Sequence, residues 1–281
     1  MAQQGQNGGG CGGSRAAMDL QDKLIESSLG RIKHKLLVMS GKGGVGKSSI
    51  AANIAVALSR KGFKTGLLDV DLHGPSIAKI MGIDSLLDVT PQNLIIPYTF
   101  TQNLKVVSMQ ALMPEADHAV IWRGPAKHGV IRQFIADVMW DDLDYLVIDA
   151  PPGTGDEPLT VAQLIGDAEA VIVCTPQEVA CADVRKSIHF CKKMNMKIAG
   201  LVENMGSFPC PHCGEKIALF GDAEGGKRTA NEADIPFLGS IPFDLAVVKA
   251  CDTGRPASNE ATPTPFAEAL NGVVDKITQG A

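Results

Sequence analysis

Short, uninterrupted apolar runs recur along this chain and alternate with stretches in which apolar residues are spaced by three or four. The first run covers residues 36–39, and it is followed by Ile50, Ile54 and Leu58, which form one stripe of a helix ending near Gly62. Uninterrupted runs are typical of strands buried on both faces of a parallel sheet. Further strands are predicted over residues 65–70, 105–109, 145–149, 170–175, 197–203 and 237–241.

Helical spacing returns later in the chain. It is marked by Val130, Phe134 and Val138, by Val184, Ile188 and Cys191, and by Phe266, Leu270, Val273 and Ile277. Strands that alternate with helices predict an α/β fold, with a mostly parallel sheet and helices on both faces. Ligands of such sheets bind at the carboxyl ends of the strands, so we expect the functional residues there.

The N-terminal residues differ in composition from the rest. Residues 1–15 are rich in Gly, Gln and Asn, which bury too little apolar surface to order a chain, so we predict a disordered tail. Cys11 in this tail is interpreted as a free thiol or an accessory ligand. Residues 16–34 are predicted to begin the domain with a short helix, and residues 16–281 to form one domain.

Composition and charge exclude several classes of protein. The chain has 281 residues, 45% of them hydrophobic, which suffices for one large core. Its formal net charge of −5 argues against a protein that grips nucleic acid. No apolar stretch is long enough to cross a bilayer and no signal peptide is evident, so a cytoplasmic protein is expected. The last predicted helix carries only Lys276 as a base, and we expect it to pack on the core.

A glycine-rich loop joins the first strand to the first long helix. It reads Gly41-Lys42-Gly43-Gly44-Val45-Gly46-Lys47-Ser48 and is followed by Ser49. In a loop of this pattern, backbone N–H groups surround phosphate oxygens at the positive end of a helix. Lys47 is expected to reach the outer phosphates and Ser48 to ligate Mg²⁺, so residues 41–49 are predicted to bind a nucleotide.

Carboxylates follow two other predicted strands. Asp69 and Asp71 are separated by one residue, so one can hold a magnesium-bound water while the other orients the attacking water, although such a pair can also cap a turn. Asp149 closes an apolar run, as expected of a Walker B carboxylate. Gly153 follows it, where a backbone N–H can sense a γ-phosphate.

Two cysteines, Cys210 and Cys213, have the C-x-x-C spacing that places both thiolates on one metal or cluster. Two thiolates are half a site, and the sequence contains no second C-x-x-C. A homodimer would supply the missing pair for a bridging 4Fe–4S cluster or a structural zinc. A thioredoxin-like redox pair is a further alternative, and a disulfide is disfavoured in a reducing compartment.

Lys42 is an additional lysine that an ordinary phosphate-binding loop does not need, and it points to one particular family. The loop resembles the deviant P-loop of the family that includes MinD, ParA, the nitrogenase iron protein and the Mrp/ApbC-type iron-sulfur carriers. The resemblance implies that Lys42 reaches the phosphates bound by a partner subunit across an ATP sandwich dimer. It also implies that Asp71 positions the nucleophile and Asp69 belongs to the magnesium shell. Asn204 would then hydrogen-bond the adenine, and Pro242 would belong to the loop that closes over the base.

Further blocks resemble the Mrp/ApbC-type carriers in particular. These are residues 210–244, Trp122-Arg123-Gly124-Pro125 and His73-Gly74-Pro75-Ser76, and the resemblance covers residues 17–281. It implies a homodimeric ATPase, with ATP and Mg²⁺ as ligands, that transfers a bridging 4Fe–4S cluster to apoproteins.

Three rivals from the same superfamily stay open. A MinD-like positioning ATPase would bind a membrane, and a ParA-like ATPase would bind DNA. Either of these two would carry a structural zinc at residues 210–213. A nitrogenase-like electron donor has widely spaced single cysteines as its cluster ligands, in place of C-x-x-C.

Overall fold

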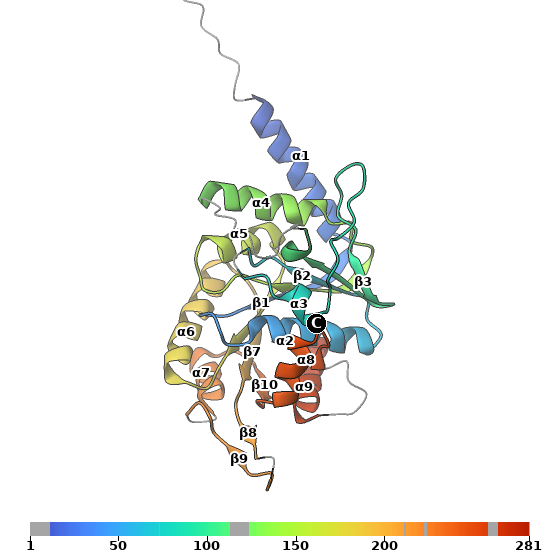
Figure 1. Ribbon diagram of the computed structural model, residues 1–281. Helices are drawn as coiled ribbons and strands as arrows, with labels where there is room; N and C mark the ends of the chain where they lie inside the picture. Colours follow the sequence, from blue (N-terminus) through green and yellow to red (C-terminus); the bar gives the residue numbers. More distant parts are fainter. Residues whose placement is uncertain are drawn as a thin grey trace, which may run out of the picture.

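A single eight-stranded sheet forms the centre of the computed structural model, which describes residues 12–72, 74–112, 124–210, 212–221, 224–257 and 264–280 (Figure 1). Its strands are β1 (Ile32–Met39), β2 (Thr65–Asp69), β3 (Tyr98–Thr101), β4 (Leu104–Ser108), β5 (Leu143–Asp149), β6 (Glu169–Cys174), β7 (Ile198–Asn204) and β10 (Phe237–Ile241). Their order is β10-β7-β6-β1-β5-β2-β4-β3, and β3 alone pairs antiparallel. The predicted mostly parallel α/β fold is therefore confirmed.

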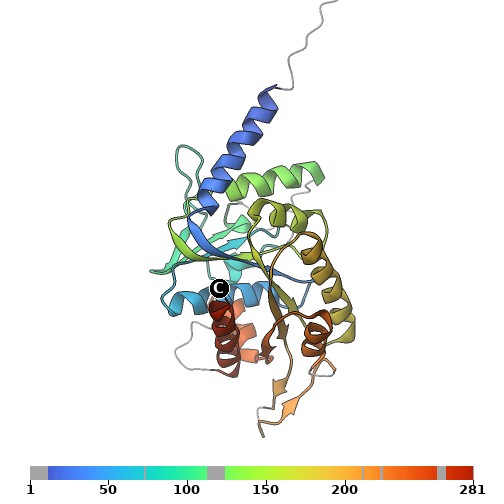
Figure 2. The ribbon, with the colours of Figure 1, turned by 180° about the vertical axis from the view of Figure 1, so that it is seen from behind.

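Helices cover both faces of the sheet (Figures 1 and 2). They are α1 (Gly12–Leu29), α2 (Lys47–Arg60), α3 (Ile77–Ile80), η1 (Met109–Leu112), α4 (Gly124–Asp137), α5 (Asp156–Ile165), α6 (Glu178–Lys193), α7 (Gly225–Ala233), α8 (Leu245–Asp252) and α9 (Pro265–Gln279). Right-handed crossovers place α2 on one face and α4, α5, α6 and α7 on the other, because the chain reverses its direction across the sheet after β4. Helix α9 packs beside α2.

The core follows the predicted apolar pattern. Residues 36–39 of β1 are all buried, and so are Ile50, Ile54 and Leu58 along one side of α2. These two elements flank the glycine-rich loop, so the loop is held between a buried strand and a buried helix.

The N-terminal boundaries differ from the prediction. Helix α1 begins at Gly12, inside the predicted tail, and β1 begins at Ile32, inside the predicted helix. Lys33 and Lys35 interrupt the apolar run of β1, yet each pairs with a carboxylate, on Asp144 and Asp167, at 2.8 Å. Residues 1–11, including Cys11, lie outside the described residues.

A two-stranded antiparallel hairpin, β8 (Phe208–Pro209) and β9 (Lys216–Ile217), extends from the body of the molecule near β10 (Figure 1). The sequence did not predict it as a hairpin. It carries the C-x-x-C pair at its tip, so that pair lies away from the core.

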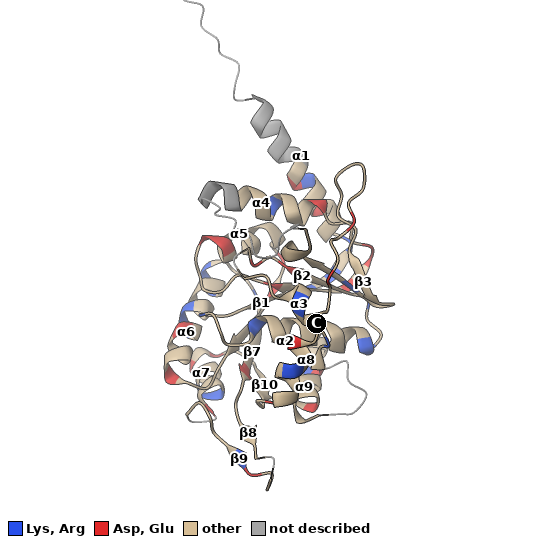
Figure 3. Ribbon diagram, in the orientation of Figure 1, with Lys and Arg blue, Asp and Glu red and all other residues tan. Residues whose placement is uncertain are grey.

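The last helix behaves as predicted. Phe266, Leu270, Val273 and Ile277 on α9 are buried, so its apolar face packs on the core. No helix among the described residues is long and apolar enough to cross a membrane. Basic and acidic positions are mixed along the described ribbon (Figure 3).

Candidate functional site

The glycine-rich loop owes its shape to backbone conformations and close approaches that only glycine allows. Gly44 and Gly46 have φ of 81° and 82°, in the left-handed region that disfavours side chains. A Cβ on Gly46 would lie 2.3 Å from Asn204 Nδ2. One on Gly41 would lie 2.5 Å from the backbone of Asp183 in α6. The loop is therefore seated against two other elements.

The other loop residues differ in their exposure to solvent. Gly43 is exposed and faces open space, whereas Val45 is buried and anchors the loop. Ser48 and Ser49 are half-buried in the first turn of α2. Open space above Gly43 and Gly44, next to the helix N-terminus, suits phosphate oxygens.

Lys47 forms a buried ion pair at the centre of the site. Its Nζ lies 2.5 Å from Asp149 Oδ1, with the two side chains 7% and 0% exposed. Burial raises the pKa of Asp149, and the Lys47 ammonium and Ser48 hydroxyl oppose that rise. The second oxygen, Asp149 Oδ2, is buried and has no hydrogen-bond partner. An unpaired carboxylate oxygen near a serine hydroxyl suits a Mg²⁺ ion.

Asp69 holds together the loop that carries Asp71. Asp69 Oδ1 accepts the N–H of Asp71 at 3.1 Å, and Oδ2 accepts the Ser108 hydroxyl at 2.9 Å and the N–H of Ile77 at 3.3 Å. Oδ1 accepts only one of these bonds, so it keeps a lone pair for the magnesium-bound water that was predicted for Asp69. Asp71 is 7% exposed and accepts the N–H of Gly74 at 3.2 Å.

The remaining predicted phosphate residues border the same loop. The N–H of Gly153 donates to the carbonyl of Ser40 at 2.9 Å, so it would have to leave that bond to contact a γ-phosphate. The Ser40 hydroxyl donates to the carbonyl of Lys42 at 2.9 Å and fixes the Lys42 backbone. The side chain of Lys42 is half-exposed and forms no ion pair within the described part of the chain.

A cavity of about 230 Å³ lies beside the loop, and we refer to it as the base pocket because the residues predicted to contact the base line it. Gly46, Ser49, Asn204 and Pro242 all line it. Asn204 is 6% exposed, and its Nδ2 donates to the carbonyl of Val45 at 2.9 Å. A side-chain amide offers both a donor and an acceptor, as contact with a base edge requires.

The sequence prediction missed the other wall of this base pocket. It is formed by α8 and the start of α9, through Val247, Val248, Cys251 and Phe266. A signal for α8 exists, because Asp244 precedes an apolar run and caps the helix by accepting the N–H of Ala246 at 2.8 Å. Ser108 was also missed, since its contact with Asp69 comes from strand pairing and has no local pattern.

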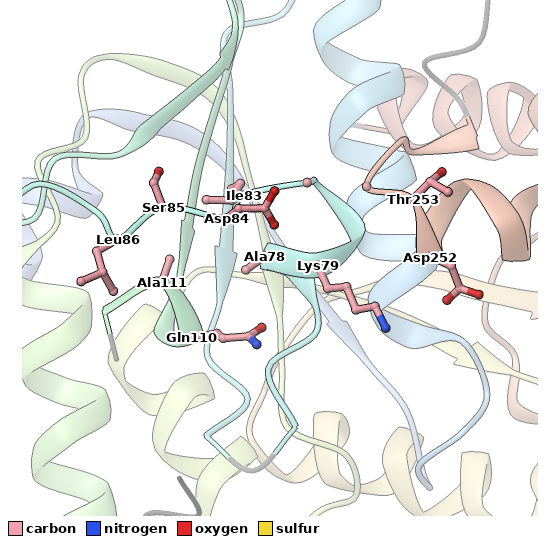
Figure 4. A pocket seen from close by; sticks show the side chains of 12 residues that line it. Ala78, Lys79, Ile83, Asp84, Ser85, Leu86, Gln110, Ala111, Asp252 and Thr253 are labelled. Atoms are coloured by element: carbon pink, nitrogen blue, oxygen red, sulfur yellow. The ribbon is translucent and has the colours of Figure 1, made fainter. Parts of the chain in front are cut away.

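A second cavity, of about 570 Å³, lies between α3, η1 and the end of α8 (Figure 4). Lys79, Asp84 and Gln110 line it, together with Asp252, which also lines the base pocket. None of the predicted site residues lines this second cavity. It is connected indirectly to the loop that carries Asp71, because the N–H of Gln110 donates to the Ser108 hydroxyl at 3.3 Å and that hydroxyl donates to Asp69.

The two hairpin cysteines form a preorganised pair. Cys213 is exposed and Cys210 half-exposed, and the N–H of Cys210 donates to the carbonyl of Glu215 at 2.8 Å. Hydrogen bonds from the backbone of Cys213 and His212 and from the Cys213 thiol lower the pKa of Cys210. Lowered thiol pKa favours the thiolate that binds metal.

No group of three or more His, Cys, Asp or Glu side chains placed to hold a metal occurs among the described residues. Within that part of the chain, the thiolate pair is therefore without a further ligand.

The blocks around Trp122 and His73 fall partly outside the described residues, which omit residues 113–123 and residue 73.

Comparisons with known families agree with the resemblance noted in the sequence. Residues 31–278 match the model of a ParA family described as NUBPL iron-transfer P-loop NTPase. An iron-sulfur cluster carrier protein of Methanocaldococcus jannaschii is 44% identical over 275 residues, covering 95% of this chain and 93% of that protein. One from Methanococcus maripaludis is 41% identical over the same length, with the same two shares.

Solved structures give the same result. A nucleotide-binding protein from Archaeoglobus fulgidus in complex with ADP has a TM-score of 0.75 and 39% identity, covering 88% of this chain and 96% of that one. The cell division ATPase MinD of Pyrococcus furiosus has a TM-score of 0.64 at 24% identity, covering 88% and 99%, and shows the shared fold alone. The predicted resemblance to the Mrp/ApbC-type carriers is confirmed.

The close contact at Gly46 generates a testable expectation. Gly46→Ala should displace Asn204 from the base pocket, and alanine in a left-handed conformation costs about 1–2 kcal/mol. We expect the affinity for ATP, measured by calorimetry, to fall about tenfold or more. Gly272→Ala in α9, where a Cβ meets open space, is the matched control. Unchanged ATP affinity in Gly46→Ala would show that Asn204 does not contact the base.

The buried carboxylate of Asp69 predicts a dependence of stability on pH. Burial, and then the neighbouring Asp149 carboxylate, raise the pKa of Asp69 from 3.8 to about 7. Between these values the folded chain retains a proton that the unfolded chain has released. The contribution of Asp69 to the free energy of unfolding therefore falls as pH rises through this window, by up to about 1.4 kcal/mol per pH unit.

Urea unfolding of the nucleotide-free protein between roughly pH 4 and 7 tests this dependence. Asp69→Asn should remove part of the slope. Asp141→Asn, a change at an exposed carboxyl whose pKa is lowered by Lys105, should not. Equal slopes for the wild type and Asp69→Asn would contradict the expectation.

Proposed function

Since the chain belongs to the ParA-type family of iron-transfer P-loop NTPases, we propose that it hydrolyses ATP and carries a 4Fe–4S cluster. Two copies of the chain bind the cluster between them and transfer it to apoproteins. The names of the archaeal relatives support the cargo, and the ADP complex of the Archaeoglobus relative supports the nucleotide.

The observation that carries this proposal is the isolated thiolate pair on a projecting hairpin. Cys210 and Cys213 offer two sulfur ligands, and no third side chain of the described residues joins them. A second copy related by a twofold axis would complete the four thiolates of a 4Fe–4S cluster. Ile217 and Leu219 beside them are 42% and 46% exposed, which supplies apolar surface for such a contact.

The nucleotide site contributes its own set of roles. Lys47 binds the outer phosphates, and Ser48 and Asp149 Oδ2 hold Mg²⁺, which supplies charge compensation at the phosphates. Asp71 orients the attacking water, and Asp69 fixes the loop on which Asp71 lies. Lys42, which has no ion-pair partner in the described part of its own chain, extends to the nucleotide of the partner copy.

A positioning ATPase with a structural zinc at Cys210 and Cys213 is the rival function, because MinD proteins share the fold. A MinD-like membrane contact would need an amphipathic helix with an unburied apolar face. In this chain the apolar face of α9 is buried in the core. This observation favours the carrier.

Replacing the hairpin cysteines separates the two halves of the proposal. Cys210→Ser with Cys213→Ser should abolish cluster binding after anaerobic reconstitution, measured as iron, sulfide and visible absorption, because no thiolate remains at the hairpin. ATP affinity should stay within about twofold of that of the cluster-free wild type, since neither residue lines the base pocket. Cys251→Ser removes a thiol from the base pocket and should keep the full iron content. A double variant that retains its iron would refute the assignment of the cluster site.

Mixed dimers test whether Lys42 acts across the interface. Lys42→Ala and Asp71→Asn should each lose ATP hydrolysis. Their mixture should recover about a quarter of wild-type turnover, because half of the dimers are then mixed and each has one complete site. Mixing Lys42→Ala with a chain that carries both changes is the control, and it should recover nothing. Absence of recovery in the first mixture would contradict action in trans.

A further inference from the structure

The segment that joins the base pocket to the hairpin is short and firmly bonded. Asn204 ends β7 in the base pocket, and Cys210 follows only six positions later. Between them, the N–H of Gly206 donates to the carbonyl of Ile241 at 3.0 Å, and the carbonyl of Ser207 accepts the N–H of Phe243 at 2.7 Å. The base-pocket loop and the root of the hairpin are therefore parts of one bonded unit.

An aromatic pair continues this unit into the hairpin itself. The rings of Phe208 and Phe243 meet edge to face, with centroids 6.0 Å apart and planes at 63°. Phe243 lines the base pocket, whereas Phe208 is the first residue of β8, two positions before Cys210. A base that displaces Phe243 must therefore also displace Phe208 or break the ring contact.

The opposite side of the root is fixed by a buried carboxylate. Glu203 is fully buried, and its oxygens accept the N–H of Gly226 at 2.7 Å and the hydroxyl of Ser240 at 2.8 Å. A Cβ on Gly206 would lie 2.0 Å from Ser240 Oγ, so the backbone of Gly206 is packed tightly against Ser240. Met205 adopts a φ of 59°, which is uncommon for a residue with a side chain. Because these contacts hold this side of the root in place, a displacement of the base-pocket loop is transmitted to the hairpin.

We propose that Phe208 is a positioning residue that couples the base pocket to the thiolates of Cys210 and Cys213 within one chain, through its contact with Phe243. The inference rests on the proposed function and adds a route for coupling that does not cross the dimer interface. Coupling between two ligands is reciprocal, so the cluster must change the affinity for nucleotide by the same factor as nucleotide changes the affinity for the cluster.

The test measures both sides of this coupling on the full chain. Protein reconstituted with iron and sulfide is titrated with ADP and with a non-hydrolysable ATP analogue, and the same titrations are made without the cluster. The rate of iron loss to a chelator is followed with and without each nucleotide. We expect a cluster-dependent change in nucleotide affinity of about fivefold or more in the wild type.

Phe208→Ala should reduce that factor to less than about twofold while the iron content and the cluster-free nucleotide affinity stay near wild type. Phe208→Leu, which keeps apolar volume but has no ring edge, gives the same readout if the alanine variant folds poorly. Lys216→Ala is the control, because Lys216 pairs with Pro209 in the hairpin register but is exposed and is not a base-pocket residue.

The outcomes distinguish failure of the coupling role of Phe208 from failure of the proposed carrier function. Loss of coupling in both Phe208 variants, with coupling kept in Lys216→Ala, supports the inference. Coupling that survives in the Phe208 variants overturns it, as does a wild type that binds both ligands without coupling, and both results leave the proposed function intact. A wild type that holds no cluster overturns the proposed function and the inference with it.

Discussion

The ion pair between Lys47 and Asp149 is the interaction on which the site depends. It joins the glycine-rich loop to the end of β5, and removing one partner of such a buried pair typically costs about 3–5 kcal/mol. The pair is possible because parallel strands end together. Asp149 lies in register with Val38 of β1 and with Asp69 of β2, so residues far apart in sequence meet at one edge of the sheet.

Two features of the chain each lack a partner that a second copy could supply. Lys42 has no ion-pair partner, and Cys210 and Cys213 have no further ligand, within the described residues. A second copy would answer both needs at once. The bonded segment from Asn204 to Cys210 then gives nucleotide and cluster a connection inside each copy. The proposed carrier thus has one coupling path along the chain and one across the interface.

Much of the fold and the phosphate loop could be predicted because their signals are local. Apolar runs gave the main strands, and the loop pattern located Lys47 and Ser48 between β1 and α2. The hairpin strands escaped prediction because each has two residues and β8 contains Pro209. Ser108 escaped because only strand pairing brings it to Asp69. Contacts made by tertiary structure leave no periodic trace in the sequence.

The central claim is that two copies share one cluster. The most direct test measures the native mass and the iron content of the reconstituted protein. Anaerobic native mass spectrometry should find two chains bearing one 4Fe–4S cluster, about two cluster irons per chain. A single chain that holds a complete cluster, or a pair of chains that binds only zinc, would contradict the account.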